Sequence, residues 1–330
     1  TLDAMTEQAD KSLIAGKFEL IERAGEGGMA TVYRAVMHGA AGFSRLVAIK
    51  AIRPNLLSNN EFVDMFVEEA RVGSQLQHPN IVQTFDFGQD DQGTYFLVLE
   101  WVEGIDFGHY LTAYAKSGHR CDWPLVAAIG VESLRGLGAA HDRVDARGQR
   151  VPVIHRDVTP QNILIGTNGI VKLSDFGLSK AMDRLQMTHP DMIKGKLRYL
   201  APEVTTGQQA SPQSDLFSLG IVLWEALAER PLYPGKSDAE VFMAARKAEI
   251  PPLRELRDDL PDELIAVVER ALAREPEMRF KTAKEMLRGL TKVLRSIPES
   301  TDAYTISQTV LVARRFLGMP APRIVPPASG

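Results

Sequence analysis

The spacing of apolar residues changes once along this chain, near residue 102, and the change limits the folds that the chain can adopt. Between residues 18 and 102 most apolar runs are typical of strands, namely FELIERA, TVYRAVM, LVAIKAI, IVQTFDFG and TYFLVLEWV. One helical pattern, over residues 61–76, lies among them. Helical patterns dominate residues 107–294, with short strands around 151–173. We therefore expect an α+β protein of two lobes, a small sheet-rich lobe over residues 17–102 and a larger, mainly helical lobe over residues 103–295.

The two ends of the chain have different patterns. Residues 1–16 are polar and weakly patterned, so we expect a flexible lead-in. Residues 296–330 predict one more helix, over 302–317, followed by a Pro-rich tail. The apolar face of this helix carries Ile306, Val310, Ala313 and Leu317. That face could dock on the helical lobe of its own chain or form a self-association contact, and the pattern leaves both readings open.

Composition excludes several classes of function. A formal net charge of −4 provides no general attraction to nucleic acid, so we expect no nucleic-acid partner. The chain has one cysteine, Cys121, which rules out an internal disulfide and fits a reducing, cytoplasmic location. No apolar run reaches the roughly 18 residues of a membrane span. The first residue is Thr1, so the sequence fits a fragment, and a membrane anchor outside it stays open.

A glycine-rich stretch, AGEGGMATVYRAV, places Gly25, Gly27 and Gly28 between two strand-like runs. Such a turn lets backbone N–H groups approach phosphate oxygens closely. A dinucleotide-binding fingerprint would need a helix directly after the glycines. The following TVYRAV alternates like a strand instead, and no G-K-[ST] motif is present. The stretch therefore predicts a hairpin flap over phosphates rather than a dinucleotide site of an oxidoreductase.

A lysine and a glutamate indicate a buried ion pair. Lys50 lies on the strand LVAIKAI, on the same face as Ala48. Glu69 shares the stripe of helix 61–76 that is otherwise apolar. A carboxylate that faces a core needs a cation, and Lys50 is available for it. The plainer alternative is that both side chains lie on solvent-exposed surfaces and do not contact each other.

Several motifs follow one another in a fixed order: GEGGMATV, VAIK, Glu69, HRDVTPQN, DFG, APE and Asp215. Together they resemble the signature set of the eukaryotic-type protein kinase family, in its bacterial serine/threonine branch, over about residues 18–295. The resemblance implies the two-lobed protein kinase fold. It also implies transfer of the γ-phosphate of ATP, with Mg²⁺, to serine or threonine hydroxyls of protein substrates.

The resemblance also implies roles for particular residues. Asp157 would accept the proton of the substrate hydroxyl, and Asn162 and Asp175 would hold Mg²⁺. Lys50 would pair with the α- and β-phosphates and would be held by Glu69. The remaining nucleotide-binding positions would be the flap residues Gly25, Glu26, Gly27 and Gly28, the pocket residues Val32, Ala48, Leu99 and Leu164, and the linker residues Glu100, Trp101 and Val102.

Other matched positions are structural in the family. His155 and Phe176 would pack behind the site, and Asp215 would hold the backbone of the loop that carries Asp157. Glu203 and Arg279 would form a buried pair in the helical lobe.

The chain departs from the family pattern at several places, among them a longer connection, DRVDARGQRVP, before the catalytic loop. Ala30 replaces the third glycine of the flap, and Gly73 replaces a larger side chain, which predicts a loosely docked helix. Thr159 stands where the family has a lysine, and Lys196 stands where it has a threonine. We interpret this as an exchange, in which Lys196 reaches back towards Asp157. The alternative function is an ATP-binding pseudokinase or scaffold with little catalysis.

A regulatory phosphorylation site is also expected. Thr188 is the only threonine between Asp175 and Glu203. A phosphate on it would bring about −1.5 to −2 charges close to Arg156 and Lys180 and would order the segment.

Overall fold

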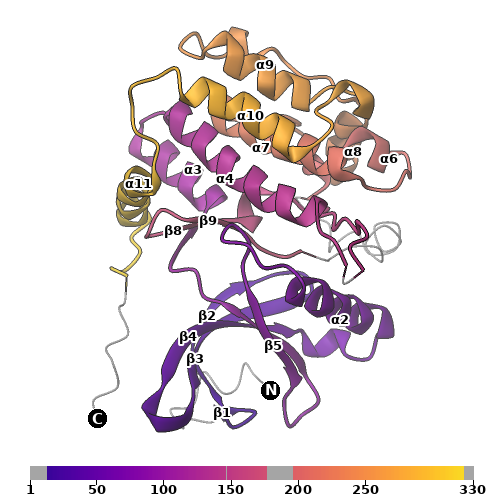
Figure 1. Cartoon of the computed structure of the whole chain (residues 1–330), viewed down its shortest axis with the longest axis vertical. Helices are drawn as coiled ribbons and strands as arrows, with labels where there is room; N and C mark the ends of the chain where they lie inside the picture. The colour runs from indigo at the N-terminus through magenta and orange to yellow at the C-terminus, as the bar shows by residue number, and fades with distance from the viewer. Residues whose placement is uncertain (1–12, 146, 177–195, 323–330) are drawn as a thin grey trace.

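The computed structural model describes residues 13–145, 147–176 and 196–322 of the chain. The first part of this region folds into an antiparallel six-stranded sheet of order β1-β2-β3-β4-β6-β5, and the part after residue 107 is mainly helical (Figure 1). The predicted two-lobed α+β arrangement is therefore observed. The strands of the large sheet are β1 (Leu13–Ile14), β2 (Phe18–Glu26), β3 (Ala30–His38), β4 (Ser44–Ile52), β5 (Thr84–Gln89) and β6 (Tyr95–Glu100).

The glycine-rich stretch forms the turn of the β2–β3 hairpin. The Gly27 N–H donates to the carbonyl of Ala30 at 2.9 Å, and a strand follows immediately. A helix after the glycines is what a dinucleotide fingerprint needs, so the oxidoreductase alternative is wrong. β3 pairs with β4, and this pairing sets Val32 opposite Lys50.

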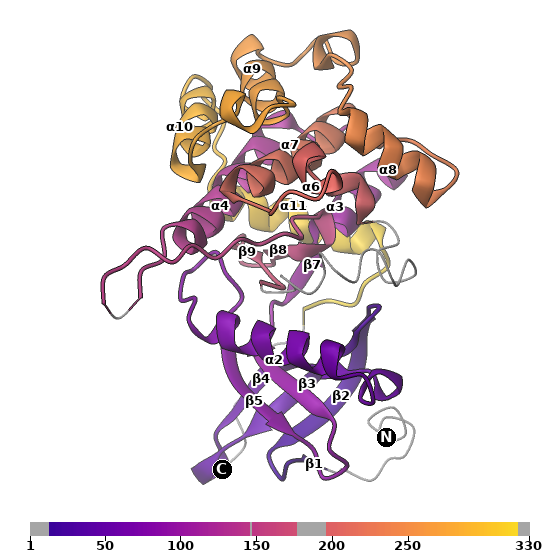
Figure 2. The ribbon, with the colours of Figure 1, turned by 90° about the vertical axis from the view of Figure 1, so that its right-hand side faces the viewer.

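Helix α2 (Asn60–Ser74) lies across one face of the sheet (Figure 2). The Asn59 side chain caps its first turn by accepting from the Glu61 N–H. The stripe predicted over residues 61–76 is buried here at Phe62, Phe66, Glu69 and Gly73. The place of a side chain at Gly73 is filled by Thr84 of β5, because a Cβ on Gly73 would lie 2.5 Å from the Thr84 Oγ1. The missing side chain at Gly73 had led us to expect a loosely docked helix, but the space is filled by a residue of β5.

The helical lobe surrounds one large apolar core. Helix α7 is buried on nearly every face, in keeping with its mostly apolar sequence, and it begins at a capping box between Ser211 and Ser214. A small sheet, β7-β8-β9, lies between this lobe and the large sheet. The helices and strands here are β7 (Gly104–Asp106), α3 (Phe107–Ser117), α4 (Trp123–His141), β8 (Ile163–Gly166), β9 (Val171–Leu173), α6 (Pro202–Thr205), α7 (Pro212–Ala228), α8 (Asp238–Lys247), α9 (Asp262–Ala271) and α10 (Ala283–Leu294).

A last helix, α11 (Ala303–Phe316), packs against α3 and β7 (Figure 1). Of the four residues predicted to form its docking face, Ile306, Val310 and Ala313 are buried and Leu317 packs against the same core. The helix is therefore docked on its own helical lobe. Among the described residues, no helix is long and apolar enough to cross a bilayer.

The predicted pair of Glu203 and Arg279 holds the base of the helical lobe together. Two parallel hydrogen bonds join the guanidinium to the carboxylate, at 2.8 and 2.7 Å, and the Arg279 side chain is fully buried. Ser214 donates a further hydrogen bond to Glu203 at 2.8 Å. Burial alone would raise the pKa of Glu203, but Arg279 outweighs this and lowers it.

Replacing Arg279 by methionine is expected to lower the free energy of unfolding by about 3–5 kcal/mol, because it leaves a buried carboxylate without its cation. Since the pKa of Glu203 is lowered in the fold, the contribution of the pair is present above the ordinary glutamate pKa. It is lost as the pH falls through the lowered value. Urea unfolding at neutral and acidic pH measures both effects. The control is Arg288→Met, at an exposed position of α10. Equal midpoints for the two variants at neutral pH would show that the pair contributes nothing.

Candidate active site

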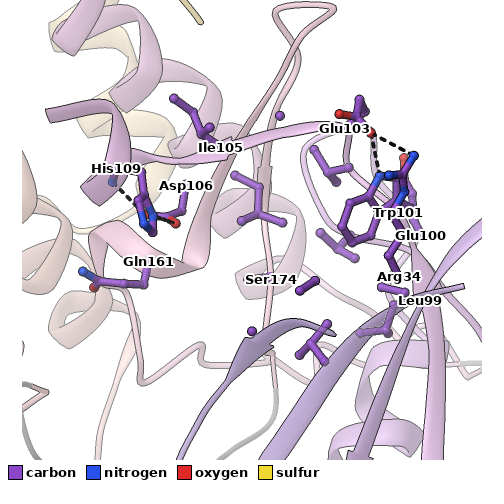
Figure 3. A pocket seen from close by; sticks show the side chains of 18 of the residues that line it. Arg34, Leu99, Glu100, Trp101, Glu103, Ile105, Asp106, His109, Gln161 and Ser174 are labelled. Carbon is purple, nitrogen blue, oxygen red and sulfur yellow. Dashed lines mark hydrogen bonds and ion pairs between the residues drawn. The ribbon is translucent and has the colours of Figure 1, made fainter. Parts of the chain in front are cut away.

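A cavity of about 530 Å³ opens between the large sheet and the helical lobe (Figure 3). Strands β2, β3 and β4 form its upper wall, the linker after β6 forms its back, and β8 and the segment before Phe176 form its lower wall. Most of the predicted nucleotide and metal residues line it together: Gly25, Val32, Ala48, Lys50, Leu99, Glu100, Trp101, Val102, Asn162, Leu164 and Asp175.

Three predicted flap residues do not line the cavity. Gly27 and Gly28 lie in the exposed hairpin turn, and Glu26 is engaged in ion pairs with Arg23 and, at 3.3 Å, with Arg53. Gly25 does line it, and a Cβ added there would meet no atom within 4 Å. The missing side chain at Gly25 therefore leaves open space on the cavity side of the hairpin.

Lys50 lies at the centre of a buried charge cluster. Its Nζ donates to the Glu69 Oε1 at 2.6 Å and to the Asp175 Oδ1 at 2.9 Å. Burial alone would lower the pKa of this ammonium, but the two carboxylates outweigh burial and raise it. The predicted pairing of Lys50 with Glu69 is thus present, and the plainer reading of two solvated side chains is wrong.

Burial raises the pKa of Glu69 to about 7, with Asp175 adding to the effect and Lys50 opposing it. Asp175 shifts in the other direction. Although burial would raise its pKa, the ammonium of Lys50 lowers it. Of the two carboxyl groups, Asp175 is therefore the one that is more readily ionised, and it lies on the side of the cluster that faces the cavity.

The loop that carries Asp157 is held from below by Asp215. The two carboxylate oxygens of Asp215 accept the backbone N–H groups of His155 and Arg156, each at 2.8 Å. His141 contacts the same carboxylate at 2.7 Å. The His155 ring packs on Phe176 with ring centroids 4.3 Å apart. These contacts fix the backbone on both sides of the site, at positions that the resemblance had marked as structural.

Asn162 points its amide nitrogen at Asp157. The Nδ2 group donates to the Asp157 carbonyl at 2.8 Å and to the Asp157 Oδ2 at 2.9 Å. The amide oxygen is then the Asn162 atom left to bind a ligand. An ionised carboxylate at Asp175 and an amide oxygen at Asn162 are hard oxygen donors, which Mg²⁺ prefers. The residues present therefore fit a magnesium ion bound together with phosphate oxygens.

Lys196 lies against Asp157. Its Nζ is 2.5 Å from the Asp157 Oδ2, and its side chain is about one-third exposed, which leaves it room to reorient. Thr159 is buried beside this loop at 4% exposure. No hydrogen bond joins Thr159 to Lys196 among the described residues. Lys196 thus reaches the position that the exchange requires, while its catalytic role stays a prediction. Thr188 and Lys180 fall outside the described residues.

Several cavity residues were not predicted from the sequence. Arg34 and Glu103 line it near the linker, and Asp106 and His109 contact each other at its mouth (Figure 3). On β3, Arg34 lies two residues after Val32 and therefore on the same face of the strand. The strand alternation could thus have predicted that Arg34 points into the cavity. Arg314, Met319, Pro320 and Ala321 also line the cavity, and they come from a segment about 200 residues away from the linker. No local pattern could reveal that contact.

Comparisons with known proteins agree with this geometry. A family model described as "Protein kinase domain" matches residues 18–289. The chain is 39% identical over 279 residues to a protein of Myxococcus xanthus named tyrosine-protein kinase MasK, a match over 84% of this chain and 43% of the relative. It is 33% identical over 273 residues to the serine/threonine-protein kinase PrkC of Bacillus subtilis, which covers 83% of this chain and 40% of the relative.

The fold has solved counterparts. The crystal structure of the PknI kinase domain of Mycobacterium tuberculosis superposes with a TM-score of 0.62 at 25% identity, covering 86% of this chain and 98% of that domain. The chain spans about two fifths of the length of the first curated relatives it matches. On the extent of the family match and on these relatives, the chain belongs to the protein kinase family.

Proposed function

We propose that this chain transfers the γ-phosphate of ATP to serine or threonine hydroxyls of protein substrates. The observation that supports it most strongly is that Lys50, Asn162 and Asp175 line one cavity, and that Asp157 lies next to it, with its Oδ2 accepting from the Asn162 Nδ2 at 2.9 Å. A pseudokinase that only binds ATP would need no proton acceptor such as Asp157.

In this proposal each side chain does one task. Asp157 accepts the proton of the attacking hydroxyl as the new oxygen–phosphorus bond forms and the bond to the β-phosphate oxygen breaks. Lys50, held by Glu69, pairs with the α- and β-phosphate oxygens. Mg²⁺ bound by Asn162 and Asp175 would neutralise charge on the phosphates. Leu99 and the linker residues enclose the adenine ring.

Lys196 supplies the charge that the catalytic loop lacks. Negative charge on the transferring phosphoryl group has to be stabilised by a donor close to Asp157. Thr159 carries no charge, and the Lys196 ammonium is next to the Asp157 carboxylate. When substrates are bound, the ammonium can contact both the carboxylate and the γ-phosphate, and the small Thr159 side chain leaves room for it.

The experiment that tests the proposed reaction is incubation of the purified chain with labelled ATP and a generic protein substrate, with and without Mg²⁺. Phosphoamino-acid analysis of the product decides the acceptor. We expect phosphoserine or phosphothreonine, because Pro160 in VTPQN and the RYLAPE motif are typical of that branch. A second candidate is tyrosine, favoured by the name of the relative that is 39% identical. Labelled tyrosine alone would replace the first candidate by the second, and no label on any residue would contradict both.

Activation by phosphorylation of Thr188 is part of the proposal. It rests on the sequence, since Thr188 is the only threonine between the DFG and APE motifs. Mass spectrometry of active protein is expected to find a phosphate on Thr188, and Thr188→Ala should lower activity. Active protein with no phosphate anywhere on residues 176–203 would contradict the idea.

The pH profile of activity is expected to rise as the pH passes through about 7. The reason is that only ionised Glu69 holds Lys50 by charge, and the pKa of Glu69 is about 7.

The contribution of Glu69 to the free energy of unfolding changes with pH in the opposite direction. A raised pKa means that the folded state holds this proton more tightly, so the stabilising contribution is full below the ordinary pKa of 4.5 and is lost as the pH rises through about 7.

The test compares Glu69→Gln with Glu68→Gln, whose side chain is partly exposed on the same helix and pairs with Arg71 at the surface. Between pH 6 and 8, the rate of Glu69→Gln should be low and nearly constant, while Glu68→Gln should follow the wild type. A Glu69→Gln profile that rises like the wild type would assign the rise to another group.

The substrates would be proteins, in the cytoplasm. Self-association through the C-terminal helix would have to use its outer face, because Ile306, Val310 and Ala313 are buried within the chain. Tyr304, Val312 and Phe316 are the large apolar side chains that this helix exposes.

A further inference from the structure

The segment after helix α11 returns to the nucleotide cavity. Arg314, Met319, Pro320 and Ala321 line the same space as Lys50 and Leu99. These residues lie beyond residues 18–289, which the family model matches. The kinase domain therefore accounts for three sides of the cavity, and a segment outside it contributes to a fourth.

The position of α11 is fixed by specific contacts as well as by its apolar face. The Tyr110 hydroxyl donates to the Thr309 Oγ1 at 2.9 Å, and the Ser307 hydroxyl donates to the Thr167 carbonyl at 2.6 Å. Gly169 has a φ of 78°, and a Cβ on it would lie 1.7 Å from the Ala303 carbonyl oxygen. Only glycine lets the β8–β9 turn approach the start of the helix this closely.

Arg314 connects the end of α11 to the linker between the lobes. It is 7% exposed. Its Nη1 donates to the Gly104 carbonyl at 2.7 Å, and its Nη2 lies 3.1 Å from the Glu103 Oε1. The same Nη2 donates to the Pro320 carbonyl at 2.9 Å. One guanidinium thus binds the backbone at the start of β7, the carboxylate of Glu103 directly after the linker, and the returning chain.

Glu103 extends this connection to the sheet-rich lobe. Its Oε2 accepts the Trp101 Nε1–H at 3.0 Å and lies 3.8 Å from the Arg34 Nη2 on β3 (Figure 3). The Arg34 guanidinium lies over the Trp101 ring, 5.5 Å from its centroid. The carboxylate of Glu103 therefore bridges β3, the linker and α11, and the position of the linker depends on Arg314.

We propose that residues 314–321 are part of the nucleotide site and bind the nucleoside end of ATP. Met319, with Pro320 and Ala321, forms an apolar outer wall against the nucleoside and excludes water from it. Arg314 is a positioning residue, which fixes the linker against which the adenine ring binds. This inference rests on the proposed binding of ATP. It adds a determinant of affinity that the kinase domain alone does not contain.

The test measures dissociation constants by calorimetry on the full chain, for adenosine and for a non-hydrolysable ATP analogue with Mg²⁺. We expect Arg314→Met to weaken both ligands by about tenfold, a typical coupling between neighbouring sites. Met319→Ala should weaken both by roughly threefold through lost apolar contact. Lys50→Met should weaken the ATP analogue and leave adenosine unchanged, because Lys50 acts at the phosphates. Arg315→Met is the matched control, since Arg315 is the exposed neighbour of Arg314.

In kinetics, Arg314→Met and Met319→Ala should raise KM for ATP and leave kcat close to the wild-type value, because neither residue is near the γ-phosphate. Thermal unfolding identifies a variant that is simply unfolded. If Arg314→Met is unfolded, Met319→Ala carries the test alone.

The outcomes separate this inference from the proposed function. Wild-type protein that binds neither ligand would overturn both. Wild-type protein that binds ATP, with equal binding by Met319→Ala and Arg314→Met, would overturn the inference alone. So would an equal loss in Arg315→Met, because the effect would then belong to the helix in general.

Discussion

Lys50→Met is expected to reduce phosphate transfer from ATP by on the order of 10³-fold. The substitution removes the only ammonium that contacts both Glu69 and Asp175 among the described residues, so the α- and β-phosphates lose the cation proposed to pair with them. Steady-state rates with saturating Mg²⁺ measure the loss. Arg45→Met is the control, because Arg45 is an exposed cation on the same strand, β4, away from the cavity.

Asp175→Ala should be as inactive as Lys50→Met. It tests the same assignment of the active site by removing a proposed Mg²⁺ ligand. Its loss should persist at high Mg²⁺ concentration, because a donor atom is missing rather than weakened. Equal labelling of the wild type and Asp175→Ala would show that the assignment is wrong or that the activity comes from a contaminating kinase.

Lys196→Ala is expected to lower kcat by about 10²–10³-fold, the usual effect of removing one well-placed donor from a site where charge develops. The Lys196 ammonium contacts Asp157, and Thr159 in the catalytic loop is buried and carries no charge. Lys236→Ala is the control, at an exposed position in the helical lobe. A different outcome is informative. If kcat stays near normal and only KM for the protein substrate rises, Lys196 recognises substrate and takes no part in the transfer.

Much of the fold was predictable because local patterns and tertiary packing agree. The strand alternation after the glycines predicted β3, and the apolar stripe on residues 61–76 predicted which face of α2 is buried. Glu69 was recognisable as an inward carboxylate because it interrupts that stripe. Gly73 was harder, since its empty place is filled by Thr84 from another strand, and a pattern within one helix cannot show what a neighbouring strand provides.

The residues of the candidate site that belong to sequence motifs were predicted, and the others were not. Lys50, Asn162 and Asp175 line one cavity and Asp157 is hydrogen-bonded to Asn162 beside it, while Gly27 and Gly28 lie in the turn outside the cavity. The C-terminal contribution was not predicted. Arg314 and Arg315 are adjacent cations at the end of a helix, and both suit the helix dipole equally well. Only the packing of α11 against the linker buries Arg314 and leaves Arg315 exposed.

An exchange of Lys196 and Thr159 tests most directly whether Lys196 supplies the charge that is missing at Thr159. The measurement is kcat for Lys196→Thr alone and for Lys196→Thr combined with Thr159→Lys, analysed as a double-mutant cycle. The single variant should lose about 10²–10³-fold, and the double variant should recover roughly tenfold or more of that loss. A double variant that is no faster than Lys196→Thr would contradict the exchange.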